Sequence, residues 1–127
     1  MTKYSQYDEQ EHILAAFAVG VGILSSIRGG RFLDIGAYNP FEFSNTRALW
    51  ERGWSGVMVE ASPGPFLDLL AEYGEDERIE LVCASVSTAG RCLTRFHHSE
   101  AGVGTSNEAH YQKWRDRAAF EGRFWTP

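Results

Sequence analysis

The chain has 127 residues, a net charge of −5 at neutral pH, and the mixture of charged, aromatic and glycine residues that is ordinary for a globular protein. A chain of this length builds one hydrophobic core, so we expect a single domain over residues 1–127. The acidic balance and the lack of any run of basic residues argue against non-specific nucleic-acid binding, which depends on clustered Lys and Arg.

The first predicted element is a helix from Asp8 to Arg28, where apolar residues recur at helical steps of three and four, at Ile13, Phe17, Val21, Leu24 and Ile27. Its apolar stretch is shorter than the ~20 residues that a membrane span needs. The residues before it are acidic, whereas a signal peptide begins with a basic segment. We therefore expect no membrane partner.

Three short apolar runs, each predicted to be a buried strand, follow at residues 31–36, 55–61 and 78–86. A helix from Ser44 to Arg52, capped by Ser44 or Asn45, separates the first two runs. A second helix begins at Ser62-Pro63, a typical cap followed by proline in the first turn, and separates the last two. This alternation predicts an α/β fold with a parallel sheet and helices on both of its faces.

The pattern changes after the third strand. Residues 91–98 alternate between polar and less polar side chains, which predicts an additional, half-exposed edge strand. The sequence Thr105-x-x-Glu108 resembles a capping box and predicts a last helix, which Gly122 ends.

The cysteines and histidines do not form a recognisable reactive site. Cys83 and Cys92 lack the second pair of ligands that a metal motif requires, and Cys83 reads as a small buried hydrophobe. Two cysteines without a disulfide framework are typical of a reduced, cytoplasmic protein. His97 and His98 are neighbours on a predicted strand, so at most one of them faces any pocket. We assign no metal site, and the catalytic residues stay unknown.

Polar or glycine residues follow each of the three predicted strands. The first strand ends in the run Asp34-Ile35-Gly36-Ala37-Tyr38-Asn39, the second in Glu60, and the third near Ser85. The carboxyl ends of parallel strands form the usual ligand site of such a sheet, and an acid after the second strand accepts hydrogen bonds from ribose hydroxyls. Glu60 lies 24 positions after Gly36, close to the usual spacing of about 20.

These features predict a nucleoside-sized ligand, although each also has a purely structural interpretation. A strand that ends in Asp-x-Gly is a common turn, and Glu60 at a strand end can simply be solvated. A dinucleotide is disfavoured because Tyr38 and Phe41 replace the second and third glycines of the Gly-x-Gly-x-x-Gly loop that binds a pyrophosphate. S-adenosylmethionine has no pyrophosphate and tolerates their loss.

Several motifs between Phe32 and Trp114 occur together in one known family. They are Asp34–Ala37, Ser44–Thr46, Arg52–Gly56 with Trp54, Glu60-x-x-Pro63, Ala84–Ser87 and Gly102–Trp114. In this combination the chain resembles the N-terminal part of the FkbM-type S-adenosylmethionine-dependent methyltransferases. The resemblance implies a Rossmann-like class I methyltransferase fold and O-methyl transfer to a small molecule or sugar.

The same resemblance implies roles for individual residues. Asp34, Gly36 and Ala37 are expected along the methionine part of the cofactor, Glu60 at the ribose and Ser85 near the adenine. The expected cofactor site also includes Tyr38, Asn39, Asn45 and Ala61.

The chain departs from the family because it reaches Pro127 before the acidic segment that would face the substrate. We therefore expect a partial, truncated domain with three parallel strands, the additional edge strand and flanking helices. The alternative is a catalytically inactive binding or assembly module on the same scaffold. In either case the first strand lacks a neighbour on one side, and we expect a homo-oligomer that covers this edge near Phe32 to Ile35.

Overall fold

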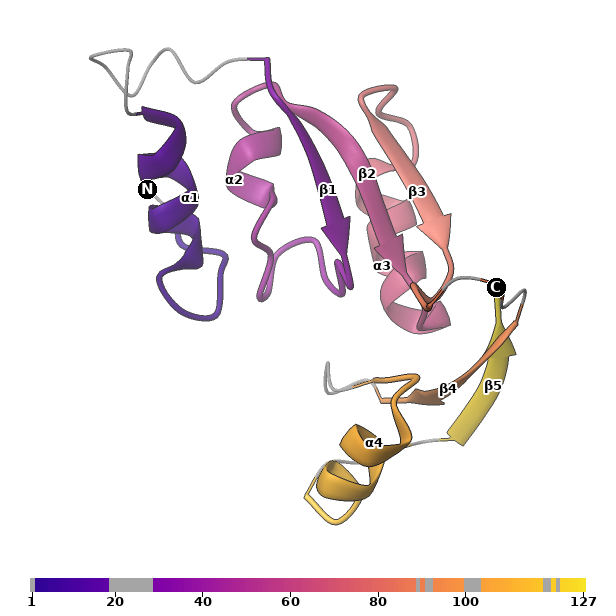
Figure 1. The fold of residues 1–127 in the computed structure, drawn as a ribbon. Helices are drawn as coiled ribbons and strands as arrows, with labels where there is room; N and C mark the ends of the chain where they lie inside the picture. Colours follow the sequence, from indigo (N-terminus) through magenta and orange to yellow (C-terminus); the bar gives the residue numbers. More distant parts are fainter. Residues whose placement is uncertain are drawn as a thin grey trace.

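The computed structural model describes residues 2–18, 29–88, 90, 93–99, 104–117, 120 and 122–127. Figure 1 shows the elements in chain order: α1 (Glu9–Ala18), β1 (Arg31–Ile35), α2 (Arg47–Trp50), β2 (Ser55–Glu60), α3 (Pro63–Tyr73), β3 (Ile79–Cys83), β4 (Thr94–His98), α4 (Glu108–Trp114) and β5 (Gly122–Thr126). No helix in these ranges has the length and apolar character to cross a membrane.

Strands β1, β2 and β3 form a parallel sheet in that order. Leu33 lies opposite Val57, and Met58 lies opposite Leu81, so the three apolar runs of the sequence pair with one another. This confirms the predicted α/β architecture with three parallel strands. Among the described strands, only β2 pairs with β1, which is therefore an edge strand.

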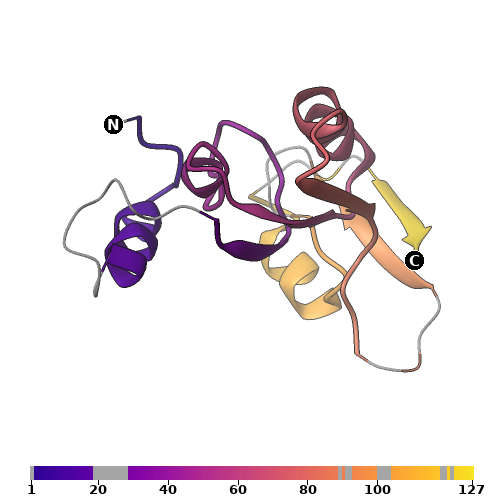
Figure 2. The same ribbon diagram turned by 90° about the horizontal axis from the view of Figure 1, so that it is seen from above.

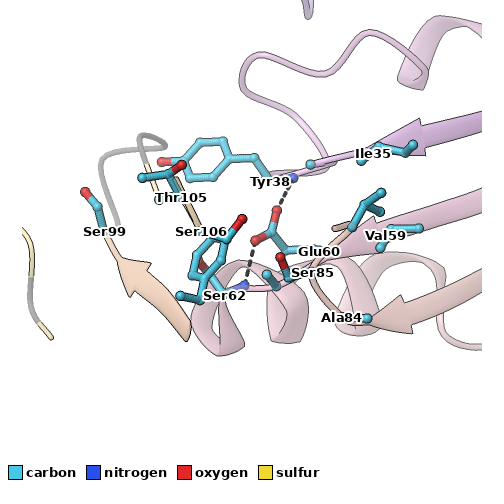
Figure 3. Close-up of a pocket in the computed structure, with 15 residues that line it drawn as sticks. Ile35, Tyr38, Val59, Glu60, Ser62, Ala84, Ser85, Ser99, Thr105 and Ser106 are labelled. Atoms are coloured by element: carbon cyan, nitrogen blue, oxygen red, sulfur yellow. Dashed lines mark hydrogen bonds between the residues drawn. The ribbon is translucent and has the colours of Figure 1, made fainter. Parts of the chain in front are cut away.

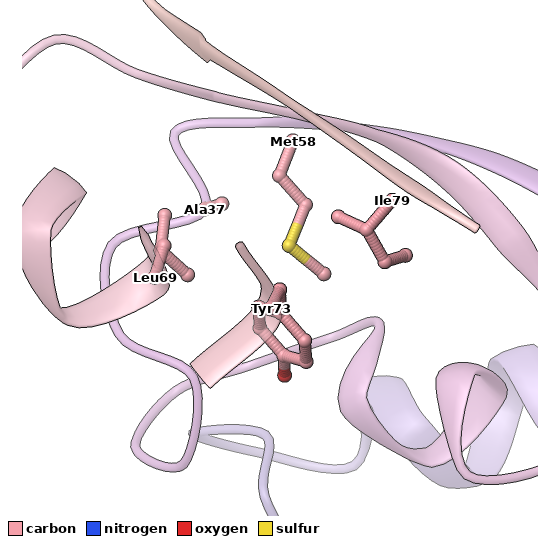
Figure 4. Packing of buried hydrophobic residues seen from close by; sticks show 5 residues of the cluster. All are labelled: Ala37, Met58, Leu69, Tyr73 and Ile79. Carbon is pink, nitrogen blue, oxygen red and sulfur yellow. The ribbon is translucent and has the colours of Figure 1, made fainter. Parts of the chain in front are cut away.

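Helices α2 and α3 lie on the same side of this sheet, as the two views in Figures 1 and 2 show. The core between α3 and the sheet contains Met58, Leu69 and Tyr73, together with Ala37 and Ile79 (Figure 4). A second cluster, of Leu14, Ala48, Leu49 and Trp54, joins α1 to α2. The prediction of helices on both faces is therefore wrong for the helices that the structure describes, since none of them covers the opposite face.

Strand β4 is not an additional edge strand of the parallel sheet, which corrects the prediction. It pairs with β5 as a separate antiparallel sheet, with Thr94 opposite Thr126 and Phe96 opposite Phe124. Gly122, expected to end the last helix, instead begins β5, because α4 already ends at Trp114. The partner strand lies far along the chain, so no local pattern around β4 indicated it.

The boundaries of three other elements differ from the prediction. Of the helix expected from Asp8 to Arg28, α1 covers Glu9–Ala18, and residues 19–28 lie outside the described part. Helix α2 is a single turn, preceded by Ser44, whose Oγ accepts the amide of Arg47 at 3.1 Å. Strand β3 ends at Cys83, which is exposed rather than buried.

The last helix begins differently from the predicted capping box. The Asn107 side chain, not that of Thr105, accepts the amide of His110 at 3.0 Å. Thr105 instead accepts the amide of Asn107 through its Oγ1. The side chains of Thr105 and Asn107 therefore turn the chain into α4, and the helix starts at Glu108, later than a cap at Thr105 predicts.

Candidate functional site

A cavity of about 240 Å³ lies at the carboxyl ends of the three parallel strands (Figure 3). Its walls come from the ends of β1, β2 and β3 and from the segments around β4. The lining residues are Ile35, Gly36, Tyr38, Val59, Glu60, Ala61, Ser62, Ala84, Ser85, Val86, Phe96, Ser99, Gly104, Thr105 and Ser106. This is the location that the sequence predicted for a ligand of a parallel α/β sheet.

Glu60 ends β2 and is the charged residue of this lining. Only 6% of its surface is exposed. Its Oε2 accepts the amide of Tyr38 at 3.0 Å, and its Oε1 accepts the amide of Ser62 at 2.7 Å (Figure 3). The two amides fix the orientation of the carboxylate, and the remaining lone pairs of its oxygens can accept hydrogen bonds from a ligand.

The turn after β1 is folded back onto β2. The amides of Gly36 and Ala37 both donate to the carbonyl of Val59, at 2.8 and 3.1 Å. Gly36 has a φ of 79°, a conformation that glycine adopts without steric cost. Tyr38 follows with a φ of 56°, which is uncommon for a bulky residue. This turn directs the Tyr38 side chain across the cavity toward Thr105 (Figure 3).

The wall at the end of β3 is tied to the end of the chain. The amide of Ala84 donates to the carbonyl of Glu60 at 3.2 Å, which continues the β2–β3 pairing by one residue. The amide of Ser85 donates to the carbonyl of Pro127 at 2.7 Å. Ser85 is thus held between the parallel sheet and the residue that follows β5.

The opposite wall comes from β4 and from residues 104–106. Phe96 and Ser99 line the cavity, while the amide and carbonyl of His97 pair with those of Thr105 at 2.8 and 3.0 Å. A Cβ atom at Gly104 would lie 2.8 Å from the Phe96 ring and 3.3 Å from Ser62 Oγ. A side chain at this position would require the Phe96 ring to shift, so glycine favours the close approach of residues 104–106 to Phe96 and Ser62.

The structure brings five of the predicted site residues together in the cavity lining: Gly36, Tyr38, Glu60, Ala61 and Ser85. The other four lie elsewhere. Asp34 accepts a hydrogen bond of 2.5 Å from Thr46 Oγ1, and its burial raises the pKa of the carboxyl group although the Thr46 bond opposes that shift. Ala37 is part of the hydrophobic core, Asn39 accepts the amides of Phe41 and Glu42, and Asn45 is exposed.

Sequence reasoning missed the hydroxyl groups of Ser62, Ser99, Thr105 and Ser106, which also line the cavity. Ser62 follows Glu60 shortly after the end of β2, where the sequence pattern predicts only a helix cap. The other three reach the cavity through the β4–β5 sheet, whose position the sequence pattern did not indicate.

The histidines of β4 do not belong to the described lining. The His97 ring is buried on the other side of the strand, where Nε2 lies 3.0 Å from Glu108 Oε2 and the ring stacks on Tyr111 at 3.9 Å. No group of His, Cys, Asp and Glu with the arrangement of a metal site occurs within the described ranges.

The lining therefore combines hydroxyl groups and apolar side chains around one oriented carboxylate, with no Lys, Arg or His among the described lining residues. Such a surface matches a ligand rich in hydroxyl groups and without negative charge, because a phosphate here would meet Glu60 without a compensating cation. No protein-family model, curated protein or solved structure matches the chain.

Proposed function

We propose that this cavity binds the nucleoside part of S-adenosylmethionine, and that the chain has a Rossmann-like methyltransferase fold of the FkbM type, for O-methyl transfer to a small molecule or sugar. The observation that carries the proposal is the buried Glu60 carboxylate, held by two backbone amides at the end of the second parallel strand. In this position a carboxylate accepts hydrogen bonds from both hydroxyls of a ribose.

The charge of the lining favours this ligand over a dinucleotide. A pyrophosphate needs backbone amides at a glycine-rich turn or cationic side chains, and the described lining offers Glu60 instead. S-adenosylmethionine carries no phosphate. Its adenosine is neutral, which suits a cavity lined by Ser62, Ser85 and other hydroxyl groups.

The volume of the cavity is suited to a part of S-adenosylmethionine rather than to the whole molecule. Pockets that enclose a whole drug-sized ligand measure roughly 300–1,000 Å³, and this one measures about 240 Å³. We therefore assign the adenosine to the cavity and the methionine part to its open border beside Gly36 and Ile35.

When bound, the cofactor supplies an activated methyl group, and the protein mainly aligns an acceptor with it. The residues of this chain bind and orient: Glu60 holds the ribose, Ser85 borders the adenine, and Tyr38 limits the access of water. No catalytic base is assigned to the chain.

Titration calorimetry with S-adenosylmethionine and S-adenosylhomocysteine tests the proposal. We expect micromolar binding of both, weakened at least tenfold by Glu60→Gln. The matched control is Glu80→Gln, which changes an exposed carboxylate on β3 and leaves affinity unchanged. Since the Glu60→Gln change also removes an acceptor for a backbone amide, Ser85→Phe provides a second variant that fills the cavity. The absence of heat at millimolar ligand would overturn the proposal.

A second candidate is a binding or assembly module without catalysis. It is favoured by the positions of the acid–base groups, because both oxygens of Glu60 accept backbone amides and His97 faces away from the cavity. Binding of S-adenosylmethionine without transfer of a labelled methyl group to any of a panel of sugars and small hydroxyl compounds would favour this candidate.

A further inference from the structure

The two-stranded sheet of β4 and β5 presents different side chains on its two faces. Side chains alternate along a strand, and the register puts Arg95 opposite Trp125 and His97 opposite Arg123. These four side chains therefore share one face. Phe96 lies on the other face, where it lines the cavity described above. The sheet thus separates the cavity from a second surface of different chemical character.

Helix α4 covers only a part of this second surface. The His97 ring is buried there, stacked on Tyr111 with the ring centres 3.9 Å apart. Beside it, Arg95 and Arg123 are exposed, and so is 62% of Trp125. A hollow of about 250 Å³ lies here, and its described lining consists of Arg95, Arg123, Phe124 and Trp125. We call it the arginine hollow.

The strand pairing brings Arg95 close to the indole of Trp125. The amide and carbonyl of His97 bond to Thr105, on the side of β4 away from β5. Arg95 and Trp125 are therefore a pair without hydrogen bonds between their backbones, the kind in which opposite side chains come closest. The central guanidinium carbon of Arg95 lies 5.3 Å from the centre of the Trp125 ring. The ring orients the guanidinium group and leaves it with its full charge.

Arg123 adds a second guanidinium group to the hollow. It precedes Trp125 by two residues on the same face of β5, so it is the diagonal neighbour of Arg95. Diagonal neighbours across an antiparallel pair are about 7–8 Å apart, a distance that long side chains span. The two guanidinium groups can therefore donate to one bound group from two sides.

No described acid forms an ion pair with either arginine of the hollow. The pKa of Glu108 is lowered first by the hydrogen bond that Gln112 donates, and to a smaller extent by the charges of His97 and Arg123. The two oxygens of Glu108 already contact Gln112 and His97, at 2.7 and 3.0 Å. In a protein with a net charge of −5, the arginine hollow is thus a local positive site.

Guanidinium groups bind a phosphate through paired N–H···O bonds, and an indole stacks on another aromatic ring. We propose that the arginine hollow binds a phosphate monoester that carries an aromatic ring, with the phosphate at Arg95 and Arg123 and the ring against the exposed part of Trp125. A phosphate suits this hollow better than a carboxylate because its charge at neutral pH approaches −2. The cavity on the other face disfavours phosphate because it contains Glu60. The inference does not rest on the function proposed for that cavity.

Titration calorimetry of the full chain with phenyl phosphate and with inorganic phosphate tests the proposal. Phenyl phosphate has no ribose, so the site proposed at Glu60 does not compete for it. We expect phenyl phosphate to bind at least tenfold more tightly than inorganic phosphate, because only the ester reaches Trp125. The absence of saturable binding at millimolar phenyl phosphate would overturn the proposal.

Charge-removing variants test the two guanidinium groups. Arg95→Gln and Arg123→Gln are each expected to weaken the binding of phenyl phosphate at least fivefold. The matched control is Arg31→Gln, which removes the same charge from an exposed position on β1 and leaves the affinity unchanged. An equal loss of affinity in all three variants would show a general effect of net charge and refute the site.

Replacement of Trp125 tests the contact with the ring. In Trp125→Leu we expect the affinity for phenyl phosphate to fall to that for inorganic phosphate, and Trp125→Phe to be intermediate. Circular dichroism verifies that both variants stay folded. Adenosine monophosphate and phosphotyrosine, titrated in parallel, distinguish a nucleotide from a phosphorylated aromatic residue as the source of the ligand. An unchanged preference for phenyl phosphate in Trp125→Leu, or no gain of either compound over inorganic phosphate, would contradict the proposal.

NMR amide shifts separate the arginine hollow from the cavity. We expect phenyl phosphate to shift the amides of Arg95, Arg123 and Trp125. The amides of Tyr38 and Ser62, which donate to the carboxylate in the cavity, should stay in place. The reverse pattern would put the phosphate in the cavity and refute the proposal. Arg95→Gln is expected to bind S-adenosylmethionine as the wild type does, so the failure of either proposal is distinguishable from that of the other.

Discussion

The Arg47 guanidinium lies 2.6 Å from the Glu72 carboxylate, and this contact joins α2 to α3 across the helix-covered side of the sheet. Arg47 is buried, and aromatic rings surround it, with the ring centres of Trp50 and Phe41 at 4.4 and 4.7 Å from its central carbon. Its Nη1 also donates to the Tyr73 hydroxyl at 3.3 Å. A helix of one turn has little intrinsic stability, so the position of α2 depends on this side chain.

We expect Arg47→Ala to lower the free energy of unfolding by about 2–3 kcal/mol, because it removes a buried ion pair and its stacking on aromatic rings. Arg47→Lys keeps the charge but loses the planar guanidinium group. We expect its free energy of unfolding to lie between that of Arg47→Ala and that of the wild type. Urea unfolding followed by circular dichroism provides the measurement. Lys3→Ala, which removes the exposed Lys3–Asp8 pair, is the control and should leave the unfolding midpoint nearly unchanged.

A second prediction concerns pH. Burial raises the pKa of Asp34 above its ordinary value of 3.8, against the opposing effect of the Thr46 hydrogen bond. The folded protein therefore binds the Asp34 proton more tightly than the unfolded chain does. As the pH rises from 3.8 through the raised pKa, the free energy of unfolding decreases because Asp34 has to ionise in its buried position. We expect Asp34→Asn to gain stability relative to wild type over this range. Urea midpoints of both proteins from acid to neutral pH measure the difference, and a constant difference would refute the assignment.

A third prediction concerns the wall formed by residues 104–106. A methyl group at Gly104 would collide with the Phe96 ring, so Gly104→Ala should displace this wall and weaken ligand binding about tenfold. The double variant Gly104→Ala, Phe96→Leu removes the colliding ring atoms and is expected to recover part of the affinity. Calorimetry on the single and double variants provides the test. A single variant with wild-type affinity would mean that the wall does not contact the ligand.

The sequence was sufficient to predict the parallel sheet, because buried strands of this type are continuous apolar runs separated by helix signals. Pro63 and Ser62 correctly indicated the start of α3. The pairing of β4 with β5 was missed because it joins segments far apart in the chain, and an antiparallel contact of this kind leaves no local signature.

The part of the candidate site that lies at the ends of the parallel strands could be predicted from the sequence, whereas the part that depends on β4 could not. Gly36, Glu60 and Ser85 were identified because the carboxyl ends of parallel strands meet. Asp34 lies outside the cavity lining because its position in β1 directs the side chain to the helix-covered face, where the Thr46 hydroxyl donates to it. The hydroxyls of Ser99 and Thr105 depend on the placement of β4, which only the three-dimensional structure provides.

The hydrogen bond from Ser85 to Pro127 has a consequence for biosynthesis. Residues 31–83 contain all three parallel strands and can form the sheet while the rest of the chain is still being made. The second wall requires β4 to find β5, whose residues leave the ribosome after those of every other described element. A nascent chain that already has its sheet therefore lacks the second wall of the cavity until residues 122–127 have emerged.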